Sequence, residues 1–466
     1  MGWGVGLVTA IAALACAPTV GGGGSEDAGE DAGEHASGSE GGAASSSSDD
    51  DGGAGGTIMP LDTSTGEVAA ECGNGVVEGS EQCDGGLGCV DCEQTCGVGG
   101  PVDLLLTGYS WTTSLTPALA VADGSGDILV TSAAGLHRVD PGGQQRWVQS
   151  ESPTTYRVFK MARADAESVW IGWLLGTDPQ QAKYSRHAVA DGSELESFAI
   201  DATESNPGAL LGTPDGELFV STHVALAGGE WRSRVERRTP IGAALSWSSE
   251  LVDDTPDDTP QLFVHALDRG HDGGLFAGAD DRLDFETVDG VVLRLDAQGV
   301  ETWRTQLDFP GKFAGARPLR ALADGGVVVT ARRQFNSTGA VGNTPAVFTR
   351  LVRLDRDGEL VWDIDPSDAV EDGRLQVMDV QVHGDGFAVA GAVVDDHGSA
   401  AAWLGYLDAH GELGCSASMQ HPNGDATTID AFFTDAEGAW MVQGYTDDAT
   451  LDQVSTARWV APVFPY

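Results

Sequence analysis

Two histidines and an aspartate within the segment HALDRGHDGG have side chains suited to chemistry. His265, Asp268 and His271 stand at intervals of three residues. Gathered at one rim of a domain, imidazole and carboxylate groups could ligate a metal ion or transfer protons. The following Asp272–Gly274 has the composition of a hairpin turn, so a strand that enters a turn is the plainer interpretation. The sequence therefore assigns no catalytic residue here.

Four aspartates form a second candidate site. Asp253, Asp254, Asp257 and Asp258 lie in one polar stretch, and carboxylate oxygens are the ligands that Ca²⁺ prefers. The spacing of a known calcium loop is missing, so we expect a solvated connection, no metal site and no cofactor, with Ca²⁺ as the alternative. The motifs GxSxG, GxxxxGK[ST] and GxGxxG have no suitable context in this chain.

Five cysteines are crowded into a short segment. Cys72, Cys83, Cys89, Cys92 and Cys96 lie among few apolar residues, so disulfides would have to hold this module together. An odd number cannot pair internally, which leaves either one free thiol or a bond to Cys415. The alternative is a zinc site on Cys89, Cys92 and Cys96, although no nearby histidine completes it.

The first half of this cysteine-rich module, residues 72–96, matches a known pattern. CGNGVVEGSEQCDGG resembles the repeat CGNGxxExGExCDDGN of myxobacterial surface proteins, with Glu78, Glu81 and the pair Cys83–Asp84 in place. The usual DDGN is replaced by Asp84–Gly85–Gly86. The resemblance implies an extracellular and often lipoprotein context, and it implies no chemistry.

The first sixteen residues, MGWGVGLVTAIAALAC, have the form of an export signal, with an apolar stretch before Cys16. They resemble a bacterial lipoprotein signal, although basic residues are missing and the residues before the cysteine match loosely. The resemblance implies a lipid on Cys16. Because Ala17 is not aspartate, it also implies an outer-membrane, surface-exposed address. An ordinary signal peptide and a secreted protein is the alternative.

Charge separates the N-terminal region from the rest of the chain. The 466 residues contain 71 acidic and 25 basic side chains, for a net charge of −46, and residues 1–101 have no Lys or Arg. Residues 17–71 are rich in Gly, Ser, Asp and Glu, which predicts a disordered tether. The charge disfavours a nucleic-acid partner. No transmembrane span is readable beyond the N-terminus.

Residues 102–466 contain a repeat of about 50 residues. The clearest copy runs from Arg320 to Pro366 and reads as four strands joined by turns of Asp and Gly. The first turn recurs at 123–126, 215–216, 272–274, 324–326, 385–386 and 437–438. The second recurs at 140–143, 191–192, 296–299, 355–358 and 408–411. Seven such copies predict an all-β fold, a seven-bladed β-propeller of four-stranded blades.

Tryptophan recurs at one place in this repeat. Trp147, Trp303 and Trp362 each follow the closing glycine by four residues, and Trp247 follows Gly242 by five. Repetition favours packing between neighbouring sheets over ligand binding. Cys415 occupies the same position, where a buried small side chain is the alternative to a disulfide.

The last repeat ends one strand short. Tyr109–Leu115, with Trp111, reads as an unpaired strand near the start. We expect it to complete the last blade and close the ring, because closure removes exposed strand edges.

The repeats resemble quinoprotein-like propellers with the pattern DGGxxVxG…LxRLDxxGxxxW (PQQ-like repeats). This resemblance implies a fold and not an activity. The first hypothesis is a non-enzymatic surface lipoprotein that presents the propeller to a protein or polysaccharide partner. The alternative is an exported enzyme, a quinone-dependent dehydrogenase or a hydrolase, with its site at the central channel. Convergent polar side chains with shifted pKa values at the centre would favour the alternative.

Overall fold

The computed structural model covers the 466-residue chain. The residues that it describes are 89–90, 93–94, 97–98, 101–104, 119–121, 125–132, 135–150, 156–176, 179–202, 204–226, 231–239, 244–252, 261–282, 288–307, 314–335, 346–370, 373–395, 399–420, 426–434, 440–448 and 455–464. The export signal with Cys16, the tether and most of the cysteine-rich module lie outside them.

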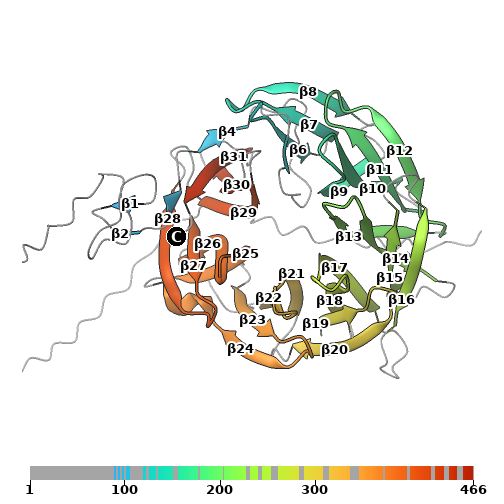
Figure 1. Ribbon diagram of the computed structural model, residues 1–466. Helices are drawn as coiled ribbons and strands as arrows, with labels where there is room; N and C mark the ends of the chain where they lie inside the picture. Colours follow the sequence, from blue (N-terminus) through green and yellow to red (C-terminus); the bar gives the residue numbers. More distant parts are fainter. Residues whose placement is uncertain are drawn as a thin grey trace, which may run out of the picture.

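Seven antiparallel sheets stand around a common axis, and in each the strands follow one another from the centre outward (Figure 1). Blade 1 contains β5 (Leu119–Ala120), β6 (Ile128–Ser132), β7 (Gly135–Val139) and β8 (Gln145–Ser150). Blade 2 contains β9 (Tyr156–Arg163), β10 (Ser168–Leu175), β11 (Gln181–Ala188) and β12 (Glu194–Ala199). Blade 3 contains β13 (Ser205–Gly212), β14 (Leu218–Ala225), β15 (Trp231–Arg238) and β16 (Leu245–Leu251).

The remaining blades repeat this order. Blade 4 contains β17 (Gln261–Arg269), β18 (Leu275–Arg282), β19 (Val288–Leu295) and β20 (Glu301–Leu307). Blade 5 contains β21 (Ala314–Ala321), β22 (Val327–Phe335), β23 (Ala346–Leu354) and β24 (Leu360–Ile364). Blade 6 contains β25 (Arg374–His383), β26 (Gly386–Val394), β27 (Ala400–Leu407) and β28 (Leu413–Met419). The prediction of a seven-bladed, all-β propeller is confirmed.

Blade 7 joins the two ends of the propeller. Its strands β29 (Ala426–Thr434), β30 (Trp440–Asp448) and β31 (Ser455–Phe464) come from the end of the chain. The outer neighbours of β31 are β3 (Gly97–Val98) and β4 (Val102–Asp103). Closure by an N-terminal segment is therefore as expected, but its assignment to Tyr109–Leu115 was wrong, because β3 and β4 fill that place. Tyr109–Leu115, with Trp111, lies outside the described residues.

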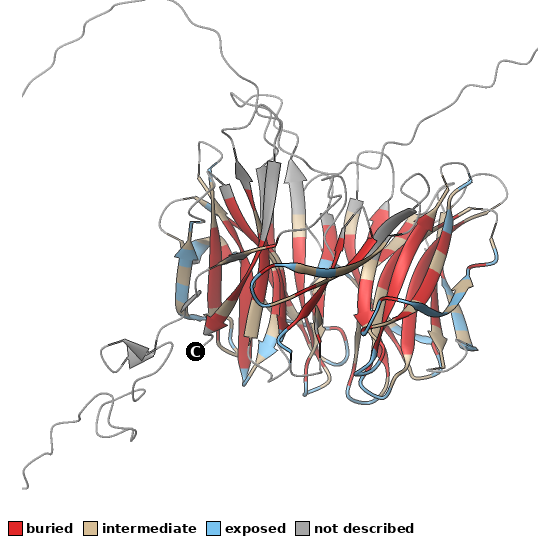
Figure 2. Cartoon of the chain, turned by 90° about the horizontal axis from the view of Figure 1, so that it is seen from above, coloured by how far each residue is buried: buried red, intermediate tan, exposed pale blue. Residues whose placement is uncertain are grey.

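The position of a strand in its blade determines its burial (Figure 2). The second strand β10 has sheet on both faces, so all of its side chains except the last are buried. The outermost strand β12 alternates between exposed and half-buried side chains, as expected for a strand with one solvated face. The only helical element among the described residues is the 3₁₀ turn η1 (Pro366–Ala369). No helix in those residues is long and apolar enough to cross a membrane.

The recurring Asp–Gly turns are stabilised by the aspartate side chain. In the turn of blade 4, Asp296 Oδ1 accepts hydrogen bonds from the backbone N–H groups of Gln298 and Val300, both at 2.9 Å. Asp140, Asp355 and Asp408 accept equivalent pairs. Gly299 closes the turn at φ +83°, a left-handed conformation that glycine adopts without steric cost.

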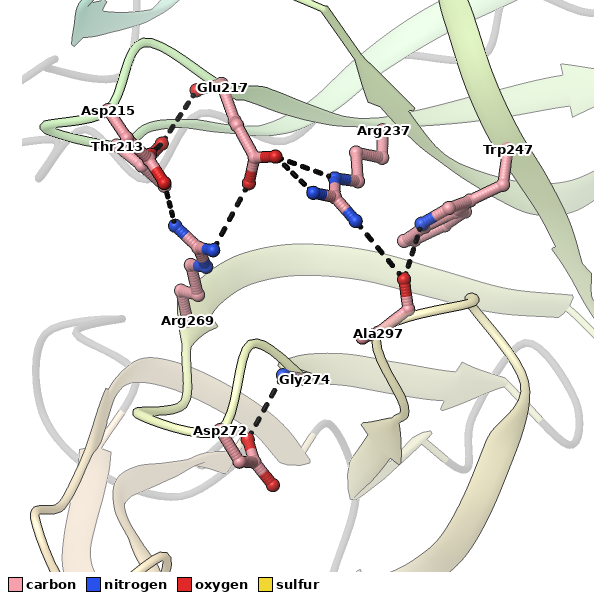
Figure 3. A network of polar contacts seen from close by, with 9 residues as sticks. All are labelled: Thr213, Asp215, Glu217, Arg237, Trp247, Arg269, Asp272, Gly274 and Ala297. Atoms are coloured by element: carbon pink, nitrogen blue, oxygen red, sulfur yellow. Dashed lines mark hydrogen bonds and ion pairs between the residues drawn. The ribbon is translucent and has the colours of Figure 1, made fainter.

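The repeated tryptophans lie at the seams between blades, and Figure 3 shows the contact between blades 3 and 4. Trp247 of blade 3 donates its indole N–H to the carbonyl of Ala297 in blade 4, 3.1 Å away. Arg237, on the neighbouring strand, donates to the same carbonyl at 3.2 Å. Trp362 and Arg353 of blade 5 both bond to the carbonyl of Ala409 in blade 6. We call this repeated pair the Trp–Arg staple; Trp303 makes the equivalent indole bond to Arg356, and Trp147 lies over Gly192.

Blade 6 lacks the staple. Cys415 occupies the tryptophan position of β28, opposite Tyr406, and is disulfide-bonded rather than a free buried thiol. Cys89 lies on β1 (Cys89–Val90), which pairs with β2 (Glu93–Gln94). Cys72, Cys83, Cys92 and Cys96 lie outside the described residues.

Candidate functional site at the centre of the ring

The innermost strands of blades 2 to 7 each carry a β-bulge near the middle. In β17 the register shifts at His265, so that His265 and Ala266 together face Gly278 of β18. The corresponding pairs are Phe159–Lys160, Gly208–Ala209, Arg317–Pro318, Met378–Asp379 and Asp430–Ala431. A bulge re-aims the side chains beside it and is frequent next to functional sites. Here bulges recur at one level around the axis.

Five of these six bulges carry one ionisable side chain each. These side chains are Lys160, His265, Arg317, Asp379 and Asp430. Two more ionisable groups, Asp280 and Arg332, stand on second strands two residues beyond the residue that faces the bulge. We call these seven residues the axial cluster. They come from blades 2, 4, 5, 6 and 7, so only the closed ring assembles them.

His265 is paired with a carboxylate. Its Nε2 lies 3.1 Å from Oδ2 of Asp280, and the ring is 20% exposed. The imidazole of His223 packs edge-on against it, with centroids 5.2 Å apart, and Phe263, which contacts His223 as well, lies nearly parallel to the His265 ring at 6.4 Å. Burial and the charge of Arg317 lower the pKa of His265, although Asp280 opposes them. The imidazole is therefore held neutral at pH 7.

The basic members of the axial cluster repel one another. Burial, followed by the charges of Arg317 and Arg332, lowers the pKa of Lys160 to about 8 despite the attraction of Asp379. Burial and Arg317 lower the pKa of Arg332 to about 10. These couplings place side chains of blades 2 and 5 in one electrostatic environment at the axis.

These three basic side chains also lack partners. Within the part of the chain that the structure describes, Lys160, Arg317 and Arg332 make no side-chain hydrogen bond or ion pair, and Nε of Arg332 is buried without an acceptor. Most other described arginines have a carboxylate partner, among them Arg138, Arg186, Arg237, Arg269, Arg294 and Arg353. Arg317 is exposed although it stands on an innermost strand, so solvent reaches the cluster.

The acidic member Asp379 has a structural role as well. Its carboxylate accepts from Arg320 of blade 5 and from the backbone N–H of Phe432 in blade 7, both at 2.9 Å. Asp268, two blades earlier on β17, likewise accepts from the backbone N–H of Ala321 in the following blade, at 2.7 Å. These bonds join the inner strands of four successive blades, 4 to 7.

The structure separates the three residues of HALDRGHDGG. His265 belongs to the axial cluster, Asp268 binds the neighbouring blade, and His271 is exposed in the turn after β17. The strand from His265 to its end at Arg269 spans roughly 13 Å, and His271 lies beyond that end. Asp253, Asp254, Asp257 and Asp258 lie outside the described residues. Within those residues, no group of three or more His, Cys, Asp or Glu side chains could hold a metal ion.

Sequence reasoning found only His265 of the axial cluster and missed the other six residues, which are Lys160, Asp280, Arg317, Arg332, Asp379 and Asp430. The available signal was a charged residue within an apolar innermost strand, as in MDV or GARPL. A strand pattern does not reveal a bulge, and it does not reveal that residues about 50 positions apart meet on one axis.

The known proteins to which this chain is similar are solved structures of low sequence identity. No protein-family model and no curated protein matches the chain. The hydrazine synthase of Kuenenia stuttgartiensis is 13% identical with a TM-score of 0.45, over 76% of this chain and 98% of that one. The Pan2 WD40 domain of Neurospora crassa is 12% identical (TM-score 0.43, 74% and 89%). An ulvan lyase of polysaccharide lyase family 25 is 11% identical (TM-score 0.49, 79% and 94%).

Proposed function

We propose that this protein is a non-enzymatic, lipid-anchored surface protein whose propeller binds an extracellular ligand at the axial cluster. The observation that carries the proposal is the convergence of seven ionisable side chains from five blades, three of them without partners among the described residues. The buried Nε of Arg332 has no acceptor, which lowers stability, and a ligand that supplies the missing acceptor explains why this group is kept.

The anchor is the second part of this proposal. The lipoprotein-like signal would attach Cys16 to the outer membrane, and the acidic stretch 17–71 would hold the propeller away from it. A coil of this length spans roughly 40 Å, and more when like charges repel. The partner would then be a polysaccharide or protein outside the cell.

Two measurements test the proposal. Mass spectrometry of membrane fractions should find a lipid on Cys16 in the wild type, and a soluble, unmodified chain in Cys16→Ala. Glycan and peptide arrays should be probed with the mature protein, with Arg317→Ala, and with the control Arg356→Ala. The side chain of Arg356 lies in an exposed turn and pairs with its neighbour Asp357, and the backbone carbonyl that accepts from Trp303 is retained in Arg356→Ala. A signal lost only in Arg317→Ala supports binding at the axis, whereas equal signals in all three proteins contradict it.

A second candidate function is an exported enzyme with its site at the same place, a hydrolase or a quinone-dependent dehydrogenase. The neutral His265 beside Asp280 and the pKa of Lys160, lowered to about 8, favour it, because a neutral imidazole can accept a proton and a lysine of lowered pKa can exchange one. Turnover of a sugar, lactone or alcohol substrate that is abolished in His265→Asn would establish this alternative and overturn the non-enzymatic proposal.

A further inference from the structure

We propose that the axial cluster binds the carboxylate of an acidic saccharide between Lys160, Arg317 and Arg332, which deepens the binding function proposed above. The starting point is the sign of the charge. In a chain with 71 acidic and 25 basic residues, these three cations stand together although their charges repel one another. An anion that binds among them would remove that repulsion.

The carboxylates nearby limit the charge of the ligand. Asp280, Asp379 and Asp430 stand within the same cluster, and Asp379 and Asp430 attract Arg332 electrostatically. The three acidic groups offset much of the positive charge, so a multiply charged phosphate would be repelled more strongly than a single carboxylate. The planar guanidinium groups of Arg317 and Arg332 have the geometry that pairs with a carboxylate through two parallel hydrogen bonds.

The position of the cluster limits the shape of the ligand. His265 is the fifth residue of the nine-residue β17, which places the bulges roughly 13 Å from the start of the inner strands. A folded domain cannot approach residues at that depth on the innermost strands. A slender molecule, such as a saccharide chain, can enter along the axis.

The axial cluster contains both basic and acidic side chains, and this combination favours a sugar acid over a peptide as the ligand. Carboxylate oxygens of Asp280 and Asp430 can accept hydrogen bonds from hydroxyl groups, while the three cations bind the acid. Five of the six bulges carry an ionisable side chain, which favours a polar ligand over the apolar side chains of a peptide. A saccharide with one carboxylate per ring presents both kinds of group at once.

The experiment compares the acid with its uncharged ester. Calorimetric titration of the mature protein with a galacturonate trisaccharide should give binding at least tenfold tighter than with the fully methyl-esterified trisaccharide, because charge-assisted hydrogen bonds are lost. Lys160→Met, Arg317→Ala and Arg332→Gln should each weaken binding of the acid about fivefold or more. Arg356→Ala, in a distant turn, should leave it unchanged, and circular dichroism should verify folding of every variant.

Each other outcome overturns the inference in a distinct way. Equal binding of acid and ester, reduced alike by Arg317→Ala, would retain an axial binding site and remove the carboxylate from it. Binding of inorganic phosphate or of a peptide with a free C-terminus, with none of the trisaccharide, would assign the cations to another anion. An absence of binding to all probes would reject the sugar acid, and the arrays described above would then decide the binding function separately.

Discussion

At the scale of single residues, the centre of the ring combines groups that stabilise the fold with groups that do not. Asp379 and Asp268 accept backbone hydrogen bonds from the next blade, as expected of buried carboxylates. Lys160 and Arg332 have no such bonds with the described residues and lie close to another cation. The second group lowers stability, which is the usual sign of a residue retained for binding.

We expect Lys160→Met to stabilise the protein at pH 7. Burial and the cations Arg317 and Arg332, opposed by Asp379, hold the pKa of Lys160 at about 8, below its value in the unfolded chain of about 10.4. The folded state therefore disfavours the charged lysine, at a cost of about 1–3 kcal/mol that is complete below pH 8. The penalty disappears as the pH rises toward 10.4.

Denaturant unfolding of wild type and Lys160→Met at pH 7 and at pH 10 measures this effect. The variant should be more stable at pH 7, and the difference between the two proteins should shrink at pH 10. A difference that is independent of pH would mean that the methionine stabilises by packing alone.

At the scale of elements, the ring is held by one set of contacts repeated at successive seams. In each contact, the aspartate stabilises the turn by accepting backbone hydrogen bonds. The glycine that closes the turn has no side chain, so the indole of a tryptophan from the preceding blade can lie against it. In blades 3 and 5 an arginine joins the tryptophan on the same carbonyl. The spacing between Gly and Trp in the sequence therefore reflects a contact between blades as well as a turn within one.

The substitutions Gly299→Ala and Gly384→Ala separate these two requirements. Both glycines have positive φ, but a Cβ on Gly299 would lie 2.6 Å from the ring of Trp247, whereas one on Gly384 would meet nothing within 4 Å. We expect Gly384→Ala to cost about 1–2 kcal/mol from backbone strain alone. Gly299→Ala should cost about 1–3 kcal/mol more, because the indole must move.

Thermal and urea unfolding of the two variants provide the comparison. Equal losses of stability would show that Trp247 yields freely and that the staple contributes little at this seam.

At the scale of the whole molecule, the ends of the propeller meet in blade 7, and this seam differs from the others. The outer neighbour of β31 comes from the N-terminal segment, so blade 7 has no turn from its third to its fourth strand to accept a staple. Blade 6 correspondingly has Cys415 in place of tryptophan, and its strand β28 contacts β3. Because Cys415 is disulfide-bonded, we infer that a covalent bond replaces the hydrogen-bonded contact at this seam.

We expect the disulfide of Cys415 to close the ring, with Cys96 as its partner, because Cys96 directly precedes β3. Cys415→Ser should lower the free energy of unfolding by about 2–4 kcal/mol. A reducing agent should bring the wild type down to the variant and should change the variant little. Peptide mapping without reduction identifies the partner. A bond to another cysteine, or equal sensitivity of both proteins to reduction, would contradict ring closure by this pair.

The sequence by itself determined the repeated blade. The Asp–Gly turns and the recurring tryptophan are local patterns, and a local pattern determines which residues become strand and turn. The number of repeats then predicts the number of blades. The same logic identified the missing strand of the last blade, although it selected Tyr109–Leu115, because a two-residue pairing such as β3 leaves almost no pattern to read.

Only the tertiary structure decided where the candidate site lies. Lys160, His265, Arg317, Asp379 and Asp430 are separated in sequence by about one repeat or more, and a bulge has no reliable sequence signature. Their meeting depends on ring closure, which places equivalent positions of different blades around one axis. The pattern HALDRGHDGG suggested one site, but residues that are close in sequence move apart along an extended strand, by about 3.3 Å per residue. Propeller geometry separated those three residues and assembled the axial cluster instead.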